Sequence, residues 1–331
     1  MKAVVYPLAG DTGILALREA PAPEPGPMQV RVRVAASALN RADILQRRGR
    51  YPAPPGWPAD IPGLEYAGEV DTLGPGVTRW KKGDRIMGLV GGGAHAEFVV
   101  VNENEALAMP VGLSYSEAAA IPEAFLTAWD ALVARGRLQA GERVLIHAVG
   151  SGVGTAAVQV AKRMGAVTVG TSRSADKLER ARALGLDEAI WTSAGGFRDR
   201  LSAPVHVVLD VLGGPAFAEN LDALAPRGRL VLLGFLQGPK AEVNLDPLLR
   251  KRLEVIGSVM RSRGSEERAA LAAAFSAQVL PAFVGADTGV GAAYMRPLRP
   301  VVGATFPFTA ISDAHAAMER DENFGKIVLT W

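Results

Sequence analysis

The sequence predicts an α/β protein in which a doubly wound parallel-sheet domain is inserted into a β-rich domain. Residues 1 to 120 carry short apolar runs separated by turn residues, and β character returns in the closing segment GKIVLTW. Between Glu142 and Ser258, strand-like and helix-like segments alternate, a pattern typical of a parallel sheet covered by helices. We therefore assign residues 1–120 and 260–331 to the β-rich domain and residues 121–259 to the parallel-sheet domain.

Length and charge fit this division and exclude one class of partner. The chain has 331 residues, of which 49% are hydrophobic, and a chain of this length usually has more than one core. Its net charge of +2, from 36 basic and 34 acidic side chains, is too balanced for a protein that neutralises many phosphates. We expect no nucleic-acid partner.

The first residues and the lack of cysteine indicate the compartment. The start MKAVVYPLAG has no basic segment followed by an apolar stretch and a cleavage site, so it does not resemble a signal peptide. Without cysteine, a zinc site would need carboxylates and the four histidines, which are scattered in the sequence. We expect a soluble, cytoplasmic protein.

The β-rich domain is expected to begin with strands and to end in a helical segment. Strand residues come from the runs VRVRVAASAL, AGEVDTLG and GDRIMGLVGGGAHAEFVVV. Near Ser116 the pattern changes to EAAAIPEAFLTAWDALVARG, whose helix formers predict helical structure that ends at Gly136. After residue 260 we expect a helix around Ser265 to Val279, a loop rich in glycine and proline, the segment ISDAHAAMER and a closing strand.

In the parallel-sheet domain, each expected strand is followed by a helical segment. The strands are VLIHAV, VTVGT, HVVLDVL, RLVLLG and VIGSV, and the helical segments between them are GTAAVQVAKRMG, ADKLERARALG, AFAENLDALA and DPLLRKR. The uncharged stretch from Val144 to Ala161 approaches the ~20 residues of a membrane span. Gly150, Gly152 and Gly154 would each weaken a helix by roughly 1 kcal/mol, so we interpret it as strand, turn and helix and expect no membrane association.

The glycine turn after the first of these strands has the features of a pyrophosphate site. Glycine lets a ligand approach the backbone, and unpaired N–H groups and the dipole at a helix start favour an anion. The turn HAVGSGVGTAAVQ departs from G-x-G-x-x-G, because Val149 and Ser151 hold the first two glycine positions counted back from Gly154. A tight turn without a ligand would look similar, but the complete βα alternation favours a dinucleotide.

The end of the second strand favours NADP over NAD. In NAD sites, an acidic residue follows the glycine turn by ~20 residues. A cation at that place suits the 2′-phosphate of NADP instead. Here Arg173, Ser174 and Lys177 cluster after the strand. Ser174 could also be a helix N-cap, and the two cations a solvated face. Asp176 could instead bind the ribose hydroxyls, which would favour NAD.

Several stretches resemble one protein family in order and over nearly the whole chain. They are ALNRADILQRRGRYPAPPG, IPGLEYAGEV, GPGVTRWKKGDRIMGL, AAAIPEAFLTAWDAL, IHAVGSGVGTAAVQVAK and NFGKIVL. They resemble the zinc-independent quinone oxidoreductases of the medium-chain dehydrogenase/reductase superfamily, most of all the tumour-suppressor-induced branch. The resemblance implies a GroES-like catalytic domain, a Rossmann domain and NADPH as the hydride donor.

The resemblance also implies chemistry without a metal. Matching the motifs of the zinc-dependent relatives places Asn40, Leu64 and Glu123 at the positions of their zinc ligands, and leucine cannot ligate a metal. No run of cysteines follows GGGAHAEFVV to form a structural zinc lobe. A reaction without a Lewis acid suits an electron-poor acceptor such as a quinone.

By resemblance, three side chains near the expected cleft would act on the acceptor. Asn40 and the Tyr51 hydroxyl would donate hydrogen bonds to the acceptor or the nicotinamide, and Asp43 would orient the loop or relay a proton. Asp43 could instead cap a helix or pair with Arg41 or Arg47. Tyr51 could instead be a surface ring packed on a proline-rich loop.

The expected cofactor contacts come from both domains. They are Asn40, Thr127, Ser151, Gly152, Val153, Arg173, Ser174, Lys177, Gly234, Phe235, Ser258, Met260 and Lys326. Thr127 could instead bond its own helix backbone, and Lys326 could be a strand-edge lysine that opposes aggregation. We expect His147, in the first buried strand, to be a satisfied core residue.

These features together predict an enzyme, an NADPH-dependent quinone reductase. One alternative is a zinc-free reductase of enals, enones or enoyl thioesters, and another is a non-catalytic NADPH-binding structural or sensor protein. The segment RLEVIGSVM could supply an apolar edge strand that joins two copies sheet to sheet. We therefore predict a homodimer.

Overall fold

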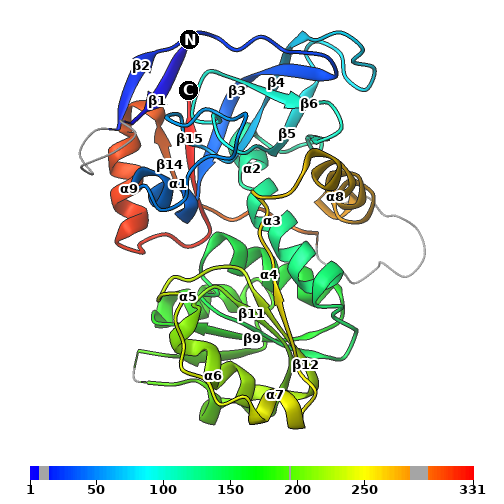
Figure 1. Ribbon diagram of the computed structural model, residues 1–331, viewed down its shortest axis with the longest axis vertical. Helices are drawn as coiled ribbons and strands as arrows, with labels where there is room; N and C mark the ends of the chain where they lie inside the picture. The colour runs from blue at the N-terminus through cyan, green and yellow to red at the C-terminus, as the bar shows by residue number, and fades with distance from the viewer. Residues whose placement is uncertain (7–14, 194, 284–296) are drawn as a thin grey trace. The chain divides into compact units, whose positions relative to one another are not determined.

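The computed structural model describes residues 1–6, 15–193, 195–283 and 297–331. The chain forms two compact units, and both chain ends lie in the first (Figure 1). Unit 1 contains Met1–Leu126, Pro297–Trp331 and the segment that begins at Met260, whereas unit 2 contains Thr127–Val259. Unit 1 therefore extends past residue 120, where the sequence placed the boundary, because the helix after residue 114 packs on the strands of unit 1.

Unit 1 is built around a sheet of seven strands in the part of the chain that the structure describes. Its order is β14-β15-β3-β4-β5-β7, and β6 also pairs with β3. The strands are β3 (Gln29–Leu39), β4 (Glu65–Leu73), β5 (Arg85–Leu89), β6 (Phe98–Asn102), β7 (Ala106–Ala108), β14 (Val302–Pro307) and β15 (Lys326–Thr330). A separate antiparallel pair joins β1 (Lys2–Val5) and β2 (Ala16–Glu19).

The burial pattern of β3 explains how this sheet forms its core. Val30, Val32 and Val34 are buried, whereas Arg31 and Arg33 between them point away from the core. Antiparallel pairing of β15 with β3 places Ile327 opposite Leu39. Residues from the two ends of the chain therefore share one sheet.

Several helices belong to unit 1 or begin in it. They are α1 (Arg41–Arg47), α2 (Tyr115–Ala119), α3 (Pro122–Trp129), α8 (Ser265–Gln278), α9 (Ile311–Glu319) and the short 3₁₀ turns η3 (Leu280–Phe283) and η4 (Phe308–Ala310). The helical segment expected up to Gly136 is interrupted between α2 and α3, because Pro122 has no N–H to continue α2. α9 packs against β14 and β15 (Figure 1).

Unit 2 contains a parallel sheet with the order β10-β9-β8-β11-β12-β13. Its strands are β8 (Arg143–Ile146), β9 (Val167–Ser172), β10 (Glu188–Trp191), β11 (Val205–Asp210), β12 (Leu224–Leu232) and β13 (Glu254–Gly257). Its helices are α4 (Gly152–Arg163), α5 (Ala175–Arg182), α6 (Gly214–Ala223) and α7 (Asp246–Arg250), with the helical turns η1 (Asp130–Arg135) and η2 (Arg198–Arg200). This strand order is that of a doubly wound sheet.

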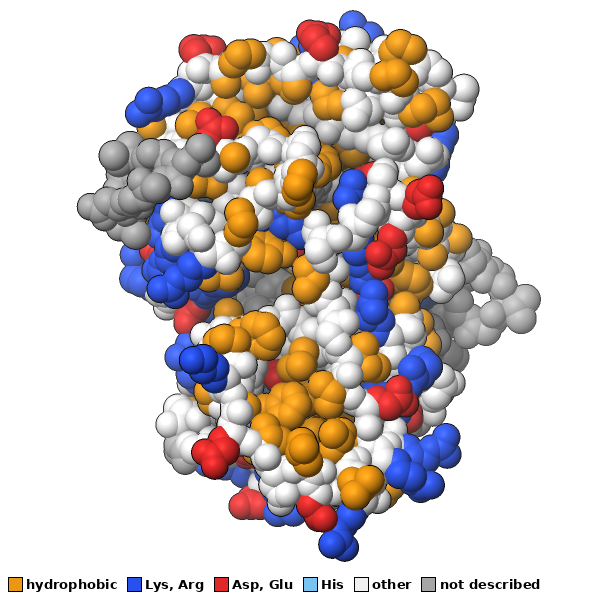
Figure 2. All heavy atoms as spheres, in the orientation of Figure 1, with side chains coloured by type: hydrophobic (Ala, Val, Ile, Leu, Met, Phe, Trp, Pro, Cys, Tyr) orange, Lys and Arg blue, Asp and Glu red, His pale blue; other side chains and the backbone are white. Residues whose placement is uncertain are grey.

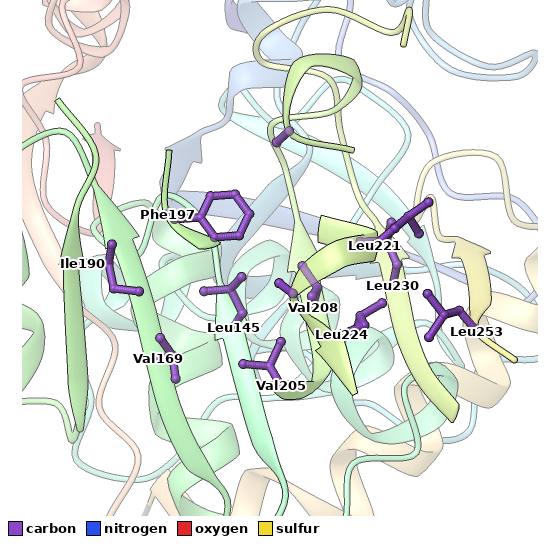
Figure 3. Close-up of a cluster of buried hydrophobic side chains, with 12 residues drawn as sticks. Leu145, Val169, Ile190, Phe197, Val205, Val208, Leu221, Leu224, Leu230 and Leu253 are labelled. Atoms are coloured by element: carbon purple, nitrogen blue, oxygen red, sulfur yellow. The ribbon is translucent and has the colours of Figure 1, made fainter. Parts of the chain in front are cut away.

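One face of this sheet carries a buried apolar cluster. Leu145, Val169, Val208 and Leu230 come from four neighbouring strands, and Phe197 packs against them from outside the sheet (Figure 3). Such a cluster stabilises the unit in proportion to the apolar area that it removes from water.

The predicted fold class is confirmed, although the sequence analysis did not name five of the strands: β1, β2, β7, β10 and β14. The α/β alternation forms the doubly wound sheet, and the first and last segments form the β-rich unit. Strand β10 was not expected, because EAIW has only four residues and no clear alternation of apolar and polar positions. The stretch from Val144 to Ala161 forms strand, turn and helix, and no described helix is both long and apolar enough to cross a bilayer. The expected loop rich in glycine and proline falls mostly in residues 284–296, outside the described residues.

Candidate functional site

The turn between β8 and α4 has the local geometry of an anion site. Ser151 is the N-cap of α4, and its Oγ accepts a hydrogen bond of 3.0 Å from the Gly154 N–H. A Cβ on Gly154 would lie 2.5 Å from the Ala148 carbonyl oxygen, so only glycine permits this close packing. Gly152 and Val153 occupy the first turn, where N–H groups have no partner within the helix. These residues fit the pyrophosphate of a dinucleotide.

One basic residue from the next βα connection lies beside this turn. Ser174 caps α5, and its Oγ accepts from the Lys177 N–H at 3.3 Å, so the N-cap interpretation is confirmed. The stem of Lys177 lies over Gly150, where an added Cβ would come within 2.8 Å of Lys177 Cδ. Arg173 is exposed, and its carbonyl oxygen accepts a hydrogen bond from the Trp191 indole. The fold thus brings Lys177 to the glycine turn.

A buried polar network joins the ends of three strands beneath the turn. His147 contacts Thr171 Oγ1 through Nδ1 at 2.8 Å and Asn220 Oδ1 through Nε2 at 2.7 Å. The Asn220 amide donates in turn to Asp210 at 3.1 Å. Burial lowers the pKa of His147 and favours its neutral form. The prediction that His147 is a satisfied core residue is confirmed.

The other predicted contacts in unit 2 have different surroundings. The Ser258 hydroxyl donates to Asp130 at 2.8 Å. Phe235 follows β12 together with Gly234 and is 54% exposed. Thr127 is buried, and its hydroxyl has no hydrogen-bond partner among the described residues. The alternative that Thr127 bonds its own helix backbone is therefore wrong.

In unit 1, Lys326 lies at the centre of a buried polar cluster. Its Nζ donates to Asn40 Oδ1 at 2.5 Å, to the Leu39 carbonyl oxygen at 3.0 Å and to Glu65 at 2.7 Å. The amide nitrogen of Asn40 donates to Glu65 at 2.9 Å and to the Ala38 carbonyl oxygen at 3.2 Å. β15 lies between β14 and β3, so the interpretation of Lys326 as a strand-edge lysine is wrong.

Asp43 is fully buried and holds the backbone around this cluster. Its two oxygens accept from the N–H groups of Asn40, at 2.7 Å, and Gly63, at 3.0 Å. It therefore holds the start of α1, as the helix-cap alternative proposed. The alternative of an ion pair with Arg41 or Arg47 is wrong, because these arginines pair with Asp321 and Glu319.

Glu123 and Tyr51 belong to the same unit. Burial, followed by repulsion from Glu65, raises the pKa of Glu123 to about 7. Burial and the neighbouring Glu123 charge also raise the pKa of Tyr51. The Tyr51 ring lies beneath the Arg261 guanidinium, 4.8 Å from its centroid, so Tyr51 is not simply a surface ring on prolines.

Arg261 and Glu65 were not among the predicted site residues. Arg261 is buried and donates to the carbonyl oxygens of Gly91 and Tyr51 and to the Gln46 side chain. Burial lowers its pKa. A charged residue inside the apolar run GLEYAG was the available signal for Glu65, whereas Arg261 had no comparable signal.

The residues of this cluster are a poor ligand set for a metal. Leu64, next to Glu65, is buried and has no ligand atom, and the Lys326 ammonium already contacts Asn40 and Glu65. Across the described parts of the chain, no group of three or more histidine, cysteine, aspartate or glutamate side chains could hold a metal ion. Met260, the remaining predicted contact, is buried in unit 1.

Comparison with known proteins identifies relatives over the whole chain. Residues 26–111 match the alcohol dehydrogenase GroES-like domain family, and residues 152–277 match the zinc-binding dehydrogenase family. The mouse quinone oxidoreductase-like protein 2 is 33% identical over 298 residues, which cover 88% of this chain and 82% of the mouse protein.

Two solved structures have the same architecture. The quinone oxidoreductase from Thermus thermophilus, solved also as a complex with NADPH, is 35% identical with a TM-score of 0.82, and the match covers 100% of each chain. The CurK enoyl reductase is 27% identical with a TM-score of 0.81 and covers 96% of this chain and 95% of its own. With its GroES-like and Rossmann-type units, the chain thus belongs to the medium-chain dehydrogenase/reductase superfamily and is an oxidoreductase.

Proposed function

We propose that this oxidoreductase is an NADPH-dependent quinone reductase that uses no metal. The observation that carries the proposal is the turn before α4, where Gly154 packs too closely for any side chain and Lys177 lies over Gly150. An amide-lined helix start with a lysine beside it suits a dinucleotide that carries an additional phosphate. The likeness to a quinone oxidoreductase crystallised with NADPH supports the same cofactor.

In this proposal, the residues of unit 2 divide the nucleotide between them. Ser151, Gly152 and Val153 would hold the pyrophosphate, while Ser174, Arg173 and Lys177 would hold the 2′-phosphate. Thr127, Gly234, Phe235 and Ser258 would contact the nicotinamide half. The bound reduced nicotinamide would supply the hydride.

The cluster in unit 1 would handle the charge that develops on the acceptor. A hydride added to a quinone leaves negative charge on a carbonyl oxygen. The Tyr51 hydroxyl is protonated at neutral pH, and its raised pKa keeps it so further into the alkaline range, so it can donate a hydrogen bond to such an oxygen. Both amide hydrogens of Asn40 are already engaged, so Asn40 would act by holding the Lys326 ammonium in place.

A second candidate acceptor is an activated carbon–carbon double bond. The likeness to the CurK enoyl reductase supports this alternative. Such an enzyme must deliver a proton to the carbon next to the carbonyl, whereas a quinone reductase delivers it to oxygen. A purely structural NADPH-binding protein would need no proton donor of either kind.

We also propose a homodimer joined through β13. This strand is at the end of the sheet order, and Val255 within it is 39% exposed. Leu245, just before α7, is 64% exposed, and Leu249, within α7, is 79% exposed. Hydrophobic side chains also gather on the visible face of unit 2 (Figure 2). An apolar edge strand of this kind favours pairing with a second copy.

A panel of acceptors tests the function. Oxidation of NADPH would be followed by its absorbance with ortho-quinones, para-quinones, enones and enoyl thioesters, on enzyme treated with a chelator. We expect turnover with quinones, faster with NADPH than with NADH and unchanged by the chelator. Turnover with enones alone would support the second candidate, and a requirement for added zinc would contradict chemistry without a metal.

A further inference from the structure

The carboxyl groups of the unit 1 cluster differ in their hydrogen bonds. Glu65 accepts from Asn40 and Lys326 at Oε1 and from the Glu123 N–H at Oε2. Asp43 accepts from a backbone N–H at each oxygen. Both carboxylates are thus committed to holding the structure together.

The carboxyl group of Glu123 has no such commitment. Its backbone N–H binds Glu65 at 2.8 Å, which fixes the first turn of α3, but no described residue donates a hydrogen bond to its side chain. The residue is of intermediate burial, so it keeps some contact with solvent. Glu123 therefore combines a fixed backbone with an available carboxyl group.

The charges around Glu123 oppose one another. Glu65 and Asp43 disfavour a third negative charge, whereas Lys326 and Arg261 favour it. Burial adds to the first effect and raises the pKa of Glu123 to about 7. Near neutral pH a large fraction of Glu123 is therefore protonated, as a general acid requires.

We propose that Glu123 is the catalytic acid that gives a proton to the reduced acceptor. The inference rests on the proposed function. Bound NADPH would supply a hydride, two electrons with one proton, which would leave NADP⁺ and convert the quinone to a hydroquinone anion. The O–H bond of Glu123 then breaks as a new O–H bond forms on the anion, which gives the hydroquinone. Water restores the proton to Glu123 through its exposed part.

Glu123→Gln tests this role, because glutamine keeps the size of the side chain but cannot give up a proton. We expect kcat with a quinone to fall about a hundredfold, within the range for general acids. The NADPH Kd, measured by nucleotide fluorescence, should stay within about twofold of the wild-type value. Wild-type kcat should decline above about pH 7, and Glu123→Gln should lose this decline.

Two further variants separate catalysis from folding. Glu123→Asp keeps an ionisable group and should recover part of kcat together with the alkaline decline. Glu266→Gln removes an exposed carboxylate of α8 and should leave kcat and its pH profile unchanged. If Glu123→Gln keeps wild-type kcat, or keeps the alkaline decline, Glu123 is not the acid.

A spectroscopic measurement that needs no turnover distinguishes failure of the catalytic role of Glu123 from failure of the proposed function. Infrared difference spectra between about pH 6 and about pH 8 should show a protonated carboxyl band in the wild type that is missing in Glu123→Gln. If the variant shows the same band as the wild type, Glu123 is not the group that titrates, and its proposed role is wrong. A wild-type protein that shows the band and binds NADPH but reduces no acceptor would contradict the proposed function, and the catalytic role with it.

Discussion

The Nζ atom of Lys326 lies 2.7 Å from Oε1 of Glu65, and neither side chain is more than 6% exposed. Asn40 contacts both partners, so the pair is part of a larger hydrogen-bonded cluster. A buried ion pair of this kind contributes little to the free energy of unfolding when it is compared with a well-packed apolar pair. Removing one partner, however, leaves the other charge buried and unpaired. A single substitution of Lys326 or of Glu65 is therefore expected to destabilise the protein.

Lys326→Met is expected to lower the free energy of unfolding by about 3–5 kcal/mol, because it leaves the Glu65 carboxylate buried and unpaired. Urea denaturation followed by circular dichroism measures the loss. The double variant with Glu65→Gln should recover part of it. A single variant as stable as the wild type would show that Glu65 finds another partner.

Gly154→Ala should weaken NADPH binding more than about tenfold, which corresponds to about 1.4 kcal/mol. The added methyl group would lie 2.5 Å from the Ala148 carbonyl oxygen, so the turn before α4 must move. Fluorescence titration with NADPH measures the effect. Gly264→Ala is the matched control, since a Cβ there meets nothing within 4 Å. Equal affinities in the two variants would contradict the site.

Lys177→Ala should raise the KM for NADPH about tenfold and change the KM for NADH little, because only NADPH carries the 2′-phosphate. Steady-state kinetics with both nucleotides and one quinone give the comparison. Lys82→Ala removes an exposed lysine from the other unit and serves as the control. An unchanged KM for NADPH, or wild-type turnover that is as fast with NADH, would contradict the assignment of NADPH.

Val255→Lys should convert a dimer into a monomer, because a charged residue on the exposed edge of β13 opposes pairing. Sedimentation at micromolar concentration distinguishes the two states. The wild type is expected to sediment as a dimer. If it sediments only as a monomer, the proposed interface is wrong.

The raised pKa of Glu123 predicts a dependence of stability on pH. Between the ordinary pKa of a glutamate and about 7, the folded protein binds a proton that the unfolded chain releases, so stability falls as pH rises through this window. Glu123→Gln should remove that loss and be more stable than the wild type by about 3 kcal/mol at pH 8, but not at pH 4. Denaturation at both pH values measures the difference. An equal effect at both would show that Glu123 titrates normally.

Local patterns were sufficient to predict most of the fold. The alternation of apolar strands and helix formers identified the parallel sheet, and Ser174 and His147 occupy the cap and core positions expected from their neighbours. The strand β10 was missed because its four residues carry no clear periodicity. Interactions between neighbours in sequence were therefore easier to predict than weak strands.

The cluster in unit 1 depends on contacts between distant segments, which a single sequence does not specify. The environment of Lys326 is set by the register of β15 against β3, which brings it to Asn40. Family resemblance selected Asn40 and Lys326 but not Arg261, whose partners are mostly backbone carbonyl oxygens. Backbone acceptors exist at every residue, so they leave no mark in the sequence.

The place of β15 inside the unit 1 sheet has a consequence during synthesis on the ribosome. The described residues of unit 2 all lie within Thr127–Val259, so this part of the unit can fold while later residues are still being translated. Unit 1 must wait for residues 326–330, because β15 fills the gap between β14 and β3 and carries the counter-ion of Glu65. A nascent chain stalled before Lys326 would thus combine a folded unit 2 with an unfinished unit 1, a state that chaperones would have to protect.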